Sequence, residues 1–161
     1  LVGSAMGAWI ALRMVEELHK AGEGERVCGL LLLAPAPDFT TELMEPELTA
    51  EQRHALEEQG YFEEPSEYSP EPNIYTKALF EDGRANLVLN GIIDTHCPVH
   101  ILQGMSDPDV PYAHAMRLAE HLPADDVTLS LIRDGDHRLS RPQDIDLILR
   151  VAASLVDRCR G

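Results

Sequence analysis

Three short and widely separated segments contain the residue types that acyl-transfer chemistry requires. Residues 3–7 (Gly-Ser-Ala-Met-Gly) have the glycine spacing of a sharp strand-to-helix turn, residues 104–111 offer Asp107, and residues 134–140 offer His137. A histidine that a carboxylate orients can act as general base for a nucleophile held on such a turn. The sequence therefore predicts one pocket assembled from three distant segments.

The central position of the first turn is Ala5. In a turn of this kind the central side chain projects above the sheet, and the next backbone N–H, here that of Met6, points toward a developing oxyanion. Alanine has no oxygen to attack a carbonyl, and the turn directs the neighbouring Ser4 away from the site. Three explanations stay open: an engineered replacement of serine, a natural loss of the nucleophile, and a sequence error.

Each segment taken alone has a simpler explanation. Glycine-flanked turns occur in many doubly wound proteins, Asp107 or Asp109 would serve as a helix cap, and a lone histidine is usually a surface or packed residue. The combination is more specific, because each segment directly follows a predicted strand. Residues that follow parallel strands converge at one edge of the sheet.

Strands and helices alternate along the part of the chain that must position these segments. We expect a strand end at residues 1–2 and further strands at 26–34, 98–103 and 127–132. Helices are expected between and after them, at residues 5–20, 113–122 and 140–157, and a long insertion at 38–95 follows the second strand. This order predicts the α/β class, with a mostly parallel sheet and helices on both faces.

Apolar residues at helical spacing predict the buried faces of the first and last helices. These residues are Trp9, Leu12, Met14, Val15 and Leu18 in the first helix, and Ile145, Ile148, Leu149, Ala152 and Leu155 in the last. Ser140 to Gln143 predicts a capping box with proline in the first turn of the last helix.

Residues 38–95 are rich in Glu and Pro and contain most of the Phe and Tyr residues. We predict that they form an inserted, mostly helical cap on a core made of residues 1–37 and 96–161. Thr49 to Gln52 predicts a capping box for a helix that stops at Gly60, and residues 73–81 predict another helix. Five side chains are candidate contacts for an apolar acyl group, or equally for holding the cap together: Phe39, Met44, Tyr61, Phe62 and Tyr75.

Composition excludes several classes of partner. A formal net charge of -15 argues against binding to nucleic acid or to an anionic membrane surface. The longest apolar run, residues 29–34, is far too short to cross a bilayer. The three cysteines are scattered and have no zinc spacing, so we expect reduced thiols, a cytoplasmic protein and no metal or other cofactor.

The three segments resemble those of the α/β-hydrolase superfamily of serine hydrolases. Residues 3–9 are similar to its nucleophile elbow, residues 104–111 to its acid turn, and residues 135–137 to its histidine loop. Residues 68–70 (Tyr-Ser-Pro) and 136–138 (Asp-His-Arg) add a likeness to bacterial relatives of a mitochondrial abhydrolase that acts as an acyl-protein thioesterase and acyl-glucuronide esterase. The resemblance covers the second half of a typical member, so we expect its N-terminal strands and second oxyanion donor to be missing here.

The resemblance implies a serine hydrolase that cleaves carboxylic esters or thioesters of small molecules or acylated proteins. Ala5 would occupy the nucleophile position, Asp107 the acid position and His137 the base position, with the Met6 N–H as one oxyanion donor. A chain without the nucleophile is expected to be nearly inactive, because its loss costs many powers of ten in turnover.

Two alternatives remain beside the hydrolase. The first is a catalytically inactive α/β-hydrolase-like binding protein in which Ala5 is native. A flavodoxin-like or Rossmann-like domain is less favoured, because residues 3–7 lack the glycine spacing of a pyrophosphate-binding turn. We also expect the chain to self-associate, because the strand at 26–34 would present an apolar edge to water.

Overall fold

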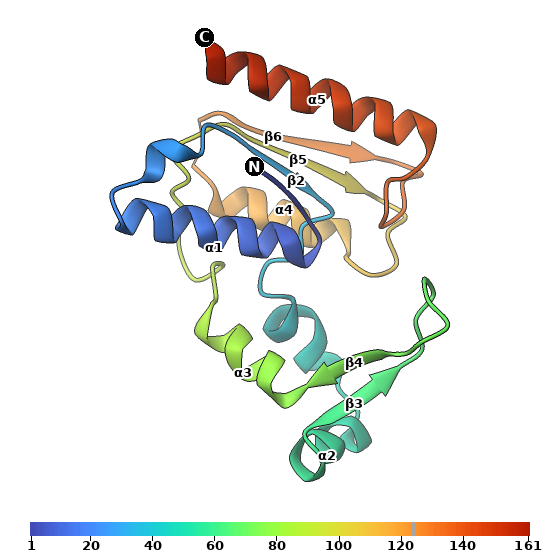
Figure 1. Cartoon of the computed structure of the whole chain (residues 1–161). Coiled ribbons are helices and arrows are strands. Elements are labelled where there is room, and N and C mark those ends of the chain that lie inside the picture. The colour runs from blue at the N-terminus through green and yellow to red at the C-terminus, as the bar shows by residue number, and fades with distance from the viewer. Residues whose placement is uncertain (124) are drawn as a thin grey trace. The chain divides into compact units, whose positions relative to one another are not determined.

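The computed structural model describes residues 1–123 and 125–161. The chain divides into two compact units, and Figure 1 shows both. The first unit comprises Leu1–Pro37 and Val88–Gly161, and the second comprises Asp38–Leu87.

A four-stranded parallel sheet forms the centre of the first unit. Its strands lie in the order β1 (Val2–Ser4), β2 (Leu30–Leu33), β5 (Val99–Gly104) and β6 (Val127–Ile132). One row across the sheet joins Gly3, Leu32, Ile101 and Leu129. Because all four strands run in the same direction, their C-terminal ends meet at one edge, which the α/β pattern predicted.

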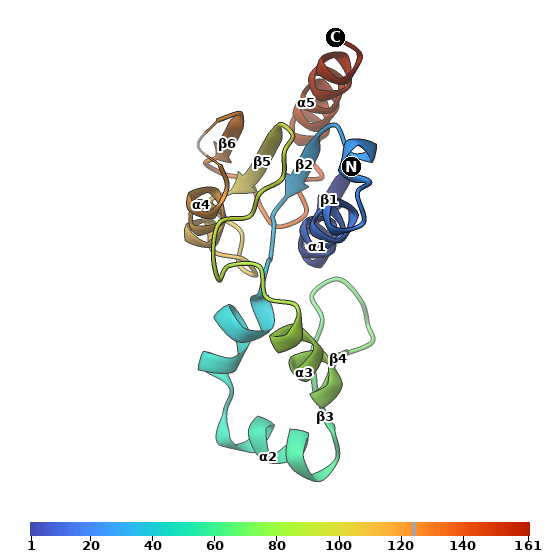
Figure 2. The ribbon, with the colours of Figure 1, turned by 90° about the vertical axis from the view of Figure 1, so that its left-hand side faces the viewer.

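Helices cover both faces of this sheet. Figures 1 and 2 show α1 (Met6–Lys20) and α4 (Tyr112–His121) on one face and α5 (Pro142–Arg160) on the other. Leu30, Leu31 and Leu32 of β2 are at most 1% exposed, as expected for a strand covered on both sides. The predicted fold class and the order of elements in this unit are therefore confirmed.

The boundaries of β2 were predicted too widely. Residues Gly24–Arg26 form a short 3₁₀ turn, and the strand itself spans Leu30–Leu33. The predicted bare edge on β2 is also wrong, because β1 pairs with it from Val2 to Ser4. The N-terminal amine of Leu1 extends this pairing by donating to the Gly29 carbonyl at 3.0 Å. β1 and β6 are therefore the two edge strands of the sheet in this structure, and Val2 of β1 is 59% exposed.

The long helices bury narrower faces than their apolar patterns predicted. In α1, Trp9, Leu12 and Val15 are buried, whereas Met14 is exposed. In α5, Val151 and Leu155 join the core and Ile148 and Ala152 pack against it, but Ile145 and Leu149 are exposed. Periodicity alone could not distinguish the stripe that contacts the sheet from the apolar residues beside it.

The start of α5 differs from the predicted capping box. Arg141, and not Ser140, is the N-cap residue, and Pro142 is the first helical residue. The carboxylate of Asp144 accepts hydrogen bonds from the Arg141 backbone N–H at 3.3 Å and from its guanidinium Nε at 2.8 Å. The start of the helix is thus held by the ion pair between Arg141 and Asp144, and not by the Ser140 hydroxyl that the pattern suggested.

The second unit contains short helices and one β-hairpin. Along the chain it contains a π-helical turn (Thr40–Met44), a 3₁₀ turn (Glu45–Glu47), α2 (Ala50–Glu58), β3 (Tyr61–Glu64), β4 (Asn73–Thr76) and α3 (Lys77–Ala85). The predicted capping box is confirmed: Thr49 Oγ1 accepts from the Gln52 N–H, and the Gln52 side chain accepts from the Thr49 N–H. Gly60 follows the helix with a φ of 84°.

The helix predicted over residues 73–81 is wrong in its first half. Residues 73–76 form β4, which pairs antiparallel with β3 and places Tyr75 opposite Phe62. Thr76 then caps α3 by accepting a hydrogen bond from the Leu79 N–H. The pairing of β4 with β3, with the eight residues 65–72 between the two strands, therefore outweighs the helical pattern of residues 73–76.

The expectation of three reduced cysteines is wrong. Cys28 and Cys159 form a disulfide between the segment before β2 and the last turn of α5, with their Cα atoms 5.5 Å apart. Cys97 keeps a free thiol. The bonded pair is separated by 131 positions, so its proximity arises only from the packing of α5 on the sheet. Among the described residues, no helix combines the length and the apolar character that crossing a membrane requires.

Candidate active site

Ala5 lies in a strained turn between β1 and α1. Its φ of 52° and ψ of -119° fall outside the regions that residues with a Cβ normally occupy. Its N–H donates to the Leu33 carbonyl at 2.9 Å, and its own carbonyl accepts from the Ala36 N–H at 3.1 Å. These two bonds hold the turn against the C-terminal end of β2.

Gly3 has a steric reason to be glycine. A Cβ at this position would lie 2.5 Å from the Gly7 carbonyl oxygen and 2.7 Å from the Ala8 Cα. The strand and the helix can therefore approach each other only because the side chain is absent. The Met6 N–H lies in the first turn of α1, where backbone N–H groups lack an intrahelical acceptor and attract negative charge.

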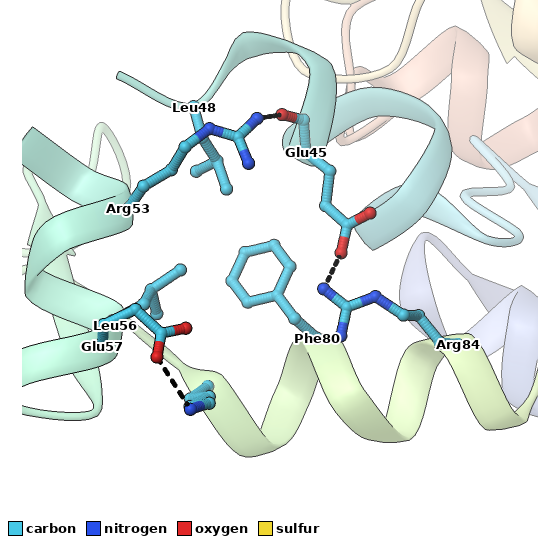
Figure 3. Close-up of a pocket in the computed structure, with 8 residues that line it drawn as sticks. Glu45, Leu48, Arg53, Leu56, Glu57, Phe80 and Arg84 are labelled. Carbon is cyan, nitrogen blue, oxygen red and sulfur yellow. Dashed lines mark hydrogen bonds and ion pairs between the residues drawn. The ribbon is translucent and has the colours of Figure 1, made fainter. Parts of the chain in front are cut away.

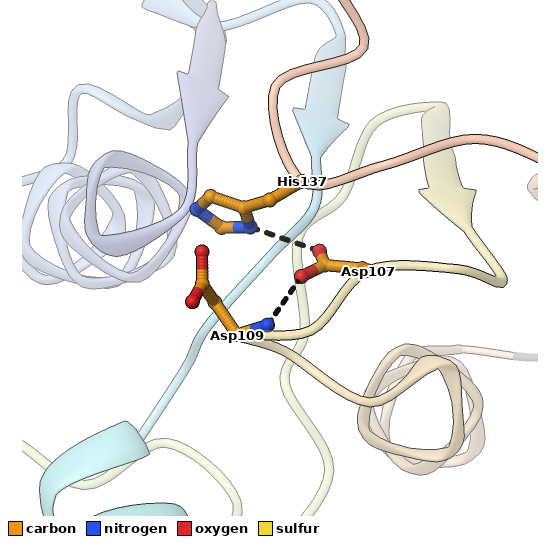
Figure 4. Close-up of side chains that lie close together, drawn as sticks. All are labelled: Asp107, Asp109 and His137. Carbon is orange, nitrogen blue, oxygen red and sulfur yellow. Dashed lines mark hydrogen bonds and ion pairs between the residues drawn. The ribbon is translucent and has the colours of Figure 1, made fainter. Parts of the chain in front are cut away.

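Asp107 follows β5 and has a fully buried carboxylate. Its Oδ2 accepts from His137 Nδ1 at 2.8 Å, and Figure 4 shows this bond. Its Oδ1 accepts from the backbone N–H groups of Asp109 at 2.8 Å and Val110 at 2.9 Å. The carboxylate thus orients the imidazole while its other oxygen is held by the loop itself.

Gln103 is a further positioning residue, and sequence reasoning missed it. Its side chain is completely buried, and its Nε2 donates to Asp107 Oδ2 at 3.3 Å, to the Gly104 carbonyl at 2.9 Å and to the Val110 carbonyl at 3.1 Å. These bonds fasten both ends of the acid loop. The signal in the sequence was an amide near the end of a largely apolar strand.

The loop that carries His137 is fastened at both sides. Leu139 is 1% exposed within the core, and its N–H donates to Asp136 Oδ1 at 2.9 Å. Arg141 pairs with Asp134 at the start of the loop, with NH1 to Oδ2 at 2.9 Å, and with Asp144 of α5. The imidazole therefore projects from a backbone that is anchored before and after it.

The acid loop and the histidine loop are in direct contact. The Ser106 N–H donates to the Gly135 carbonyl at 2.9 Å, and a Cβ on Gly104 would lie 2.3 Å from that same oxygen. Glycine at 104 therefore permits the approach that allows Asp107 and His137 to meet.

The two partners shift each other's pKa in opposite directions. Burial opposes the charged carboxylate of Asp107, but hydrogen bonds from His137, Val110 and Asp109 outweigh burial and hold its pKa below the ordinary value. The hydrogen bond to Asp107 raises the pKa of His137 against the effect of its own burial. The nearby carboxylates of Asp109 and Asp136 act in the same direction.

The hydrogen bond between His137 and Asp107 assigns the tautomer of the neutral imidazole. An ionised Asp107 only accepts, so the proton of the shared hydrogen bond belongs to His137 Nδ1. The other ring nitrogen, Nε2, is then unprotonated and able to accept a proton. This is the state that a general base requires.

Asp107, Asp109 and His137 have possible ligand atoms within 4.8 Å of one another. A metal ion would compete with bonds that already exist, because both Asp107 oxygens and His137 Nδ1 are engaged. The donor set therefore suits a hydrogen-bonded acid and base better than a metal centre.

The sheet brings the elbow to the same edge as this pair. Ser4, Leu33 and Leu102 occupy one row, with Ser130 next to them on β6. Ala5 follows the first of these strands at its C-terminal end, Asp107 follows β5 and His137 follows β6.

Three comparisons bear on this arrangement. The crystal structure described as "Putative hydrolase from Agrobacterium vitis S4" has 64% sequence identity and a TM-score of 0.94, covering 96% of this chain and 60% of that one. The structure of mouse alpha/beta hydrolase domain-containing protein 10 has 29% identity and a TM-score of 0.80, covering 98% of this chain and 61% of that one. The chain has the α/β-hydrolase fold and is similar in sequence to these two proteins.

The third comparison concerns a curated relative of this chain. Human palmitoyl-protein thioesterase ABHD10, mitochondrial, is 30% identical over 98% of this chain and 50% of its own length. The chain thus spans about half the length of the curated relatives it matches. No protein-family profile matches the sequence.

The predicted acyl contacts of this chain lie in its second unit and differ in exposure. Phe62 is 4% exposed, and its ring centroid lies 5.4 Å from that of Tyr75 and 6.3 Å from that of Phe80. Met44 and Tyr75 pack against the same small core. Tyr61 is 39% exposed, and Phe39 is partly buried. At least three of the five therefore help to hold this unit together.

Proposed function

We propose that the protein to which this sequence belongs is a serine hydrolase of carboxylic esters or thioesters, with Ala5 at its nucleophile position. The observation that carries the proposal is the 2.8 Å bond between His137 Nδ1 and Asp107 Oδ2 at the sheet edge where the strained turn of Ala5 also ends. The names of the relatives, which include a hydrolase and a palmitoyl-protein thioesterase, support the same reaction class.

A serine in place of Ala5 would start the reaction. Its Oγ would attack the acyl carbonyl carbon while His137 Nε2 takes the hydroxyl proton, and the Met6 N–H would donate to the resulting oxyanion. When the tetrahedral intermediate collapses, the protonated imidazole would give its proton to the departing alcohol or thiol. Asp107 stabilises the imidazolium between these two steps.

Water would complete the cycle. His137 Nε2 would take a proton from a water molecule that attacks the acyl-serine, and it would return the proton to the serine as the carboxylic acid leaves. Every proton in this scheme moves through His137. The scheme uses side chains and water, and we propose no metal or organic cofactor.

The test is to restore the nucleophile. Ala5→Ser in the longest protein that contains this chain should react with a fluorophosphonate probe, and Ala5→Ser combined with His137→Ala should label far more slowly because the general base is gone. The unchanged Ala5 protein is the matched negative control. Absence of labelling in a folded Ala5→Ser protein would refute the proposed site.

Ala5 itself favours a second candidate, a binding protein that retains the pocket without turnover. Losing the nucleophile of a catalytic triad removes most of the rate enhancement, whereas binding does not require it. The source gene distinguishes the two candidates, since a serine codon at position 5 favours the enzyme. Turnover by the Ala5 protein that survives Ser4→Ala but not His137→Ala would contradict the role given to position 5.

We further propose that the predicted cap, residues 38–95, of which Asp38–Leu87 form the second unit, contributes contacts to the acyl group. Tyr61 is the exposed aromatic candidate, and Phe39 is partly exposed. The cytoplasmic location expected from the cysteines stays a prediction. The Cys28–Cys159 disulfide counts against it, because disulfides persist mainly in oxidising compartments.

A further inference from the structure

The basic residues of the second unit are gathered at one cavity. Between positions 38 and 87 the sequence has thirteen Asp and Glu residues, and its only Lys and Arg residues are Arg53, Lys77 and Arg84. All three line a single cavity of about 300 Å³. Bases scattered for solubility would not be expected to converge in this way in so acidic a segment.

The floor of this cavity is apolar. Leu48, Leu56 and Phe80 line it together with the charged residues, and Figure 3 shows the Phe80 ring between α2 and the Glu45 segment. Leu56 is 8% exposed and Phe80 is 2% exposed, so both belong to the small core of the unit. The cavity therefore combines an apolar base with a charged rim.

Two of the three bases are paired across the rim. Lys77 Nζ lies 3.2 Å from Glu57 Oε2, and Arg84 NH2 lies 2.5 Å from Glu45 Oε1. The third, Arg53, donates only to the backbone carbonyl of Glu45. Within the described part of the chain no carboxylate lies within ion-pair distance of Arg53, which leaves the rim with an excess of one positive charge.

We propose that this cavity binds a small amphipathic monocarboxylate, with its carboxylate on Arg53 and its alkyl chain on Leu48, Leu56 and Phe80. A guanidinium presents a planar set of donors that matches a carboxylate, and one donor direction is already fixed by the Glu45 carbonyl. The single excess charge favours a monoanion over a dianion. The cavity volume is at the lower end of those that hold small organic ligands, which favours a short or medium alkyl chain.

The competing explanation is that the three bases only tie the helical segments of this unit together. The ion pairs of Lys77 and Arg84 would do this without any ligand, and they join residues that are 20 and 39 positions apart. Arg53 separates the two explanations, because it has no carboxylate of its own to bridge to. The proposal concerns a different cavity from the Asp107–His137 site and does not depend on the proposed hydrolase activity.

The test uses the whole chain and three probes that divide the ligand into its parts. Octanoate carries both charge and chain, acetate carries the charge alone, and 1-octanol carries the chain alone. We expect octanoate to shift the methyl NMR signals of Leu48 and Leu56 in a saturable way, and to bind at least about tenfold more tightly than either other probe, since each part supplies independent binding free energy.

Variants locate the site. Arg53→Gln should weaken octanoate binding about tenfold, corresponding to the loss of one charge-assisted hydrogen bond. Arg26→Gln, at an exposed arginine of the other unit, is the matched control and should leave the affinity unchanged. Unchanged thermal unfolding of Arg53→Gln shows that the cavity is intact.

Three results would overturn the proposal. They are equal affinity of octanoate and 1-octanol, octanoate binding that Arg53→Gln leaves intact, and shifts confined to residues outside the cavity. The first two would show that the bases are purely structural. Added salt should weaken octanoate binding and leave 1-octanol unaffected, because only the former depends on charge.

Discussion

The disulfide between Cys28 and Cys159 should be a main source of stability in the first unit. It joins the segment before β2 to the end of α5 and closes a loop spanning 131 positions. The chain-entropy relation for a loop of this length gives about 5 kcal/mol at 25 °C. Measured values for native disulfides fall at about 2–5 kcal/mol, so we expect Cys28→Ser to destabilise the folded chain by that amount.

Thermal and chemical unfolding would measure this loss. For a chain of this size, about 2–5 kcal/mol corresponds to a fall in Tm of roughly 4–20 °C. With a urea m-value of about 2 kcal/mol/M, the midpoint should fall by about 1–2.5 M. Unfolding followed by circular dichroism should show that dithiothreitol lowers the stability of the unchanged protein by the same amount as Cys28→Ser does. Dithiothreitol should not change the stability of Cys28→Ser.

Counting thiols provides the direct control. In denaturant without reductant the protein should expose one reactive thiol, that of Cys97, and reduction should expose all three. Cys97→Ser is the matched variant and should leave the Tm difference intact. Three reactive thiols before reduction, or a Tm that reductant does not change, would refute the reasoning.

Two other measurements follow from the structure. Asp107→Asn should lower the pKa of His137, because the hydrogen bond that His137 donates to Asp107 is the largest cause of its raised value. NMR of the imidazole ring protons would measure this pKa. Because folding raises the pKa of His137, the stability that this histidine contributes is fully present below its ordinary pKa of about 6.5 and is lost as the pH rises through the folded pKa. This pH dependence should disappear in the variant, and an unchanged histidine titration would contradict the pairing. Gly3→Ala should destabilise the chain by about 1–3 kcal/mol in urea unfolding, because its Cβ would lie 2.5 Å from the Gly7 oxygen, and Gly7→Ala, whose Cβ would meet no atom within 4 Å, is the control.

Local patterns in the sequence determined much of the fold. The buried run at Leu30–Leu32, the alternation of strands and helices and the capping box of Thr49 and Gln52 all depend on neighbours within a few positions. The order of turn, acid and histidine along the chain, each after a strand, also predicted the edge of the sheet at which the candidate site lies. Such features are readable because a parallel sheet places the ends of its strands together whatever the remaining packing.

The positioning of the candidate site was only partly readable. Gln103 supports Asp107, and Arg141 fastens the loop of His137, yet both look like ordinary polar residues in the sequence. Their roles arise from side-chain contacts within folded loops, and the spacing of residues along the sequence does not reveal these contacts. Hairpin pairing likewise converted residues 73–76 from a predicted helix to a strand.

The sequence by itself determined the class of fold and the chemical types that follow each strand. Tertiary structure alone decided that Cys28 meets Cys159, that Leu1–Ser4 covers the edge of β2, and that the three bases of the acidic segment meet at one cavity. The physical reason is range: hydrophobic period and capping act over a few residues, whereas these contacts join positions that only a packed sheet and its helices bring together.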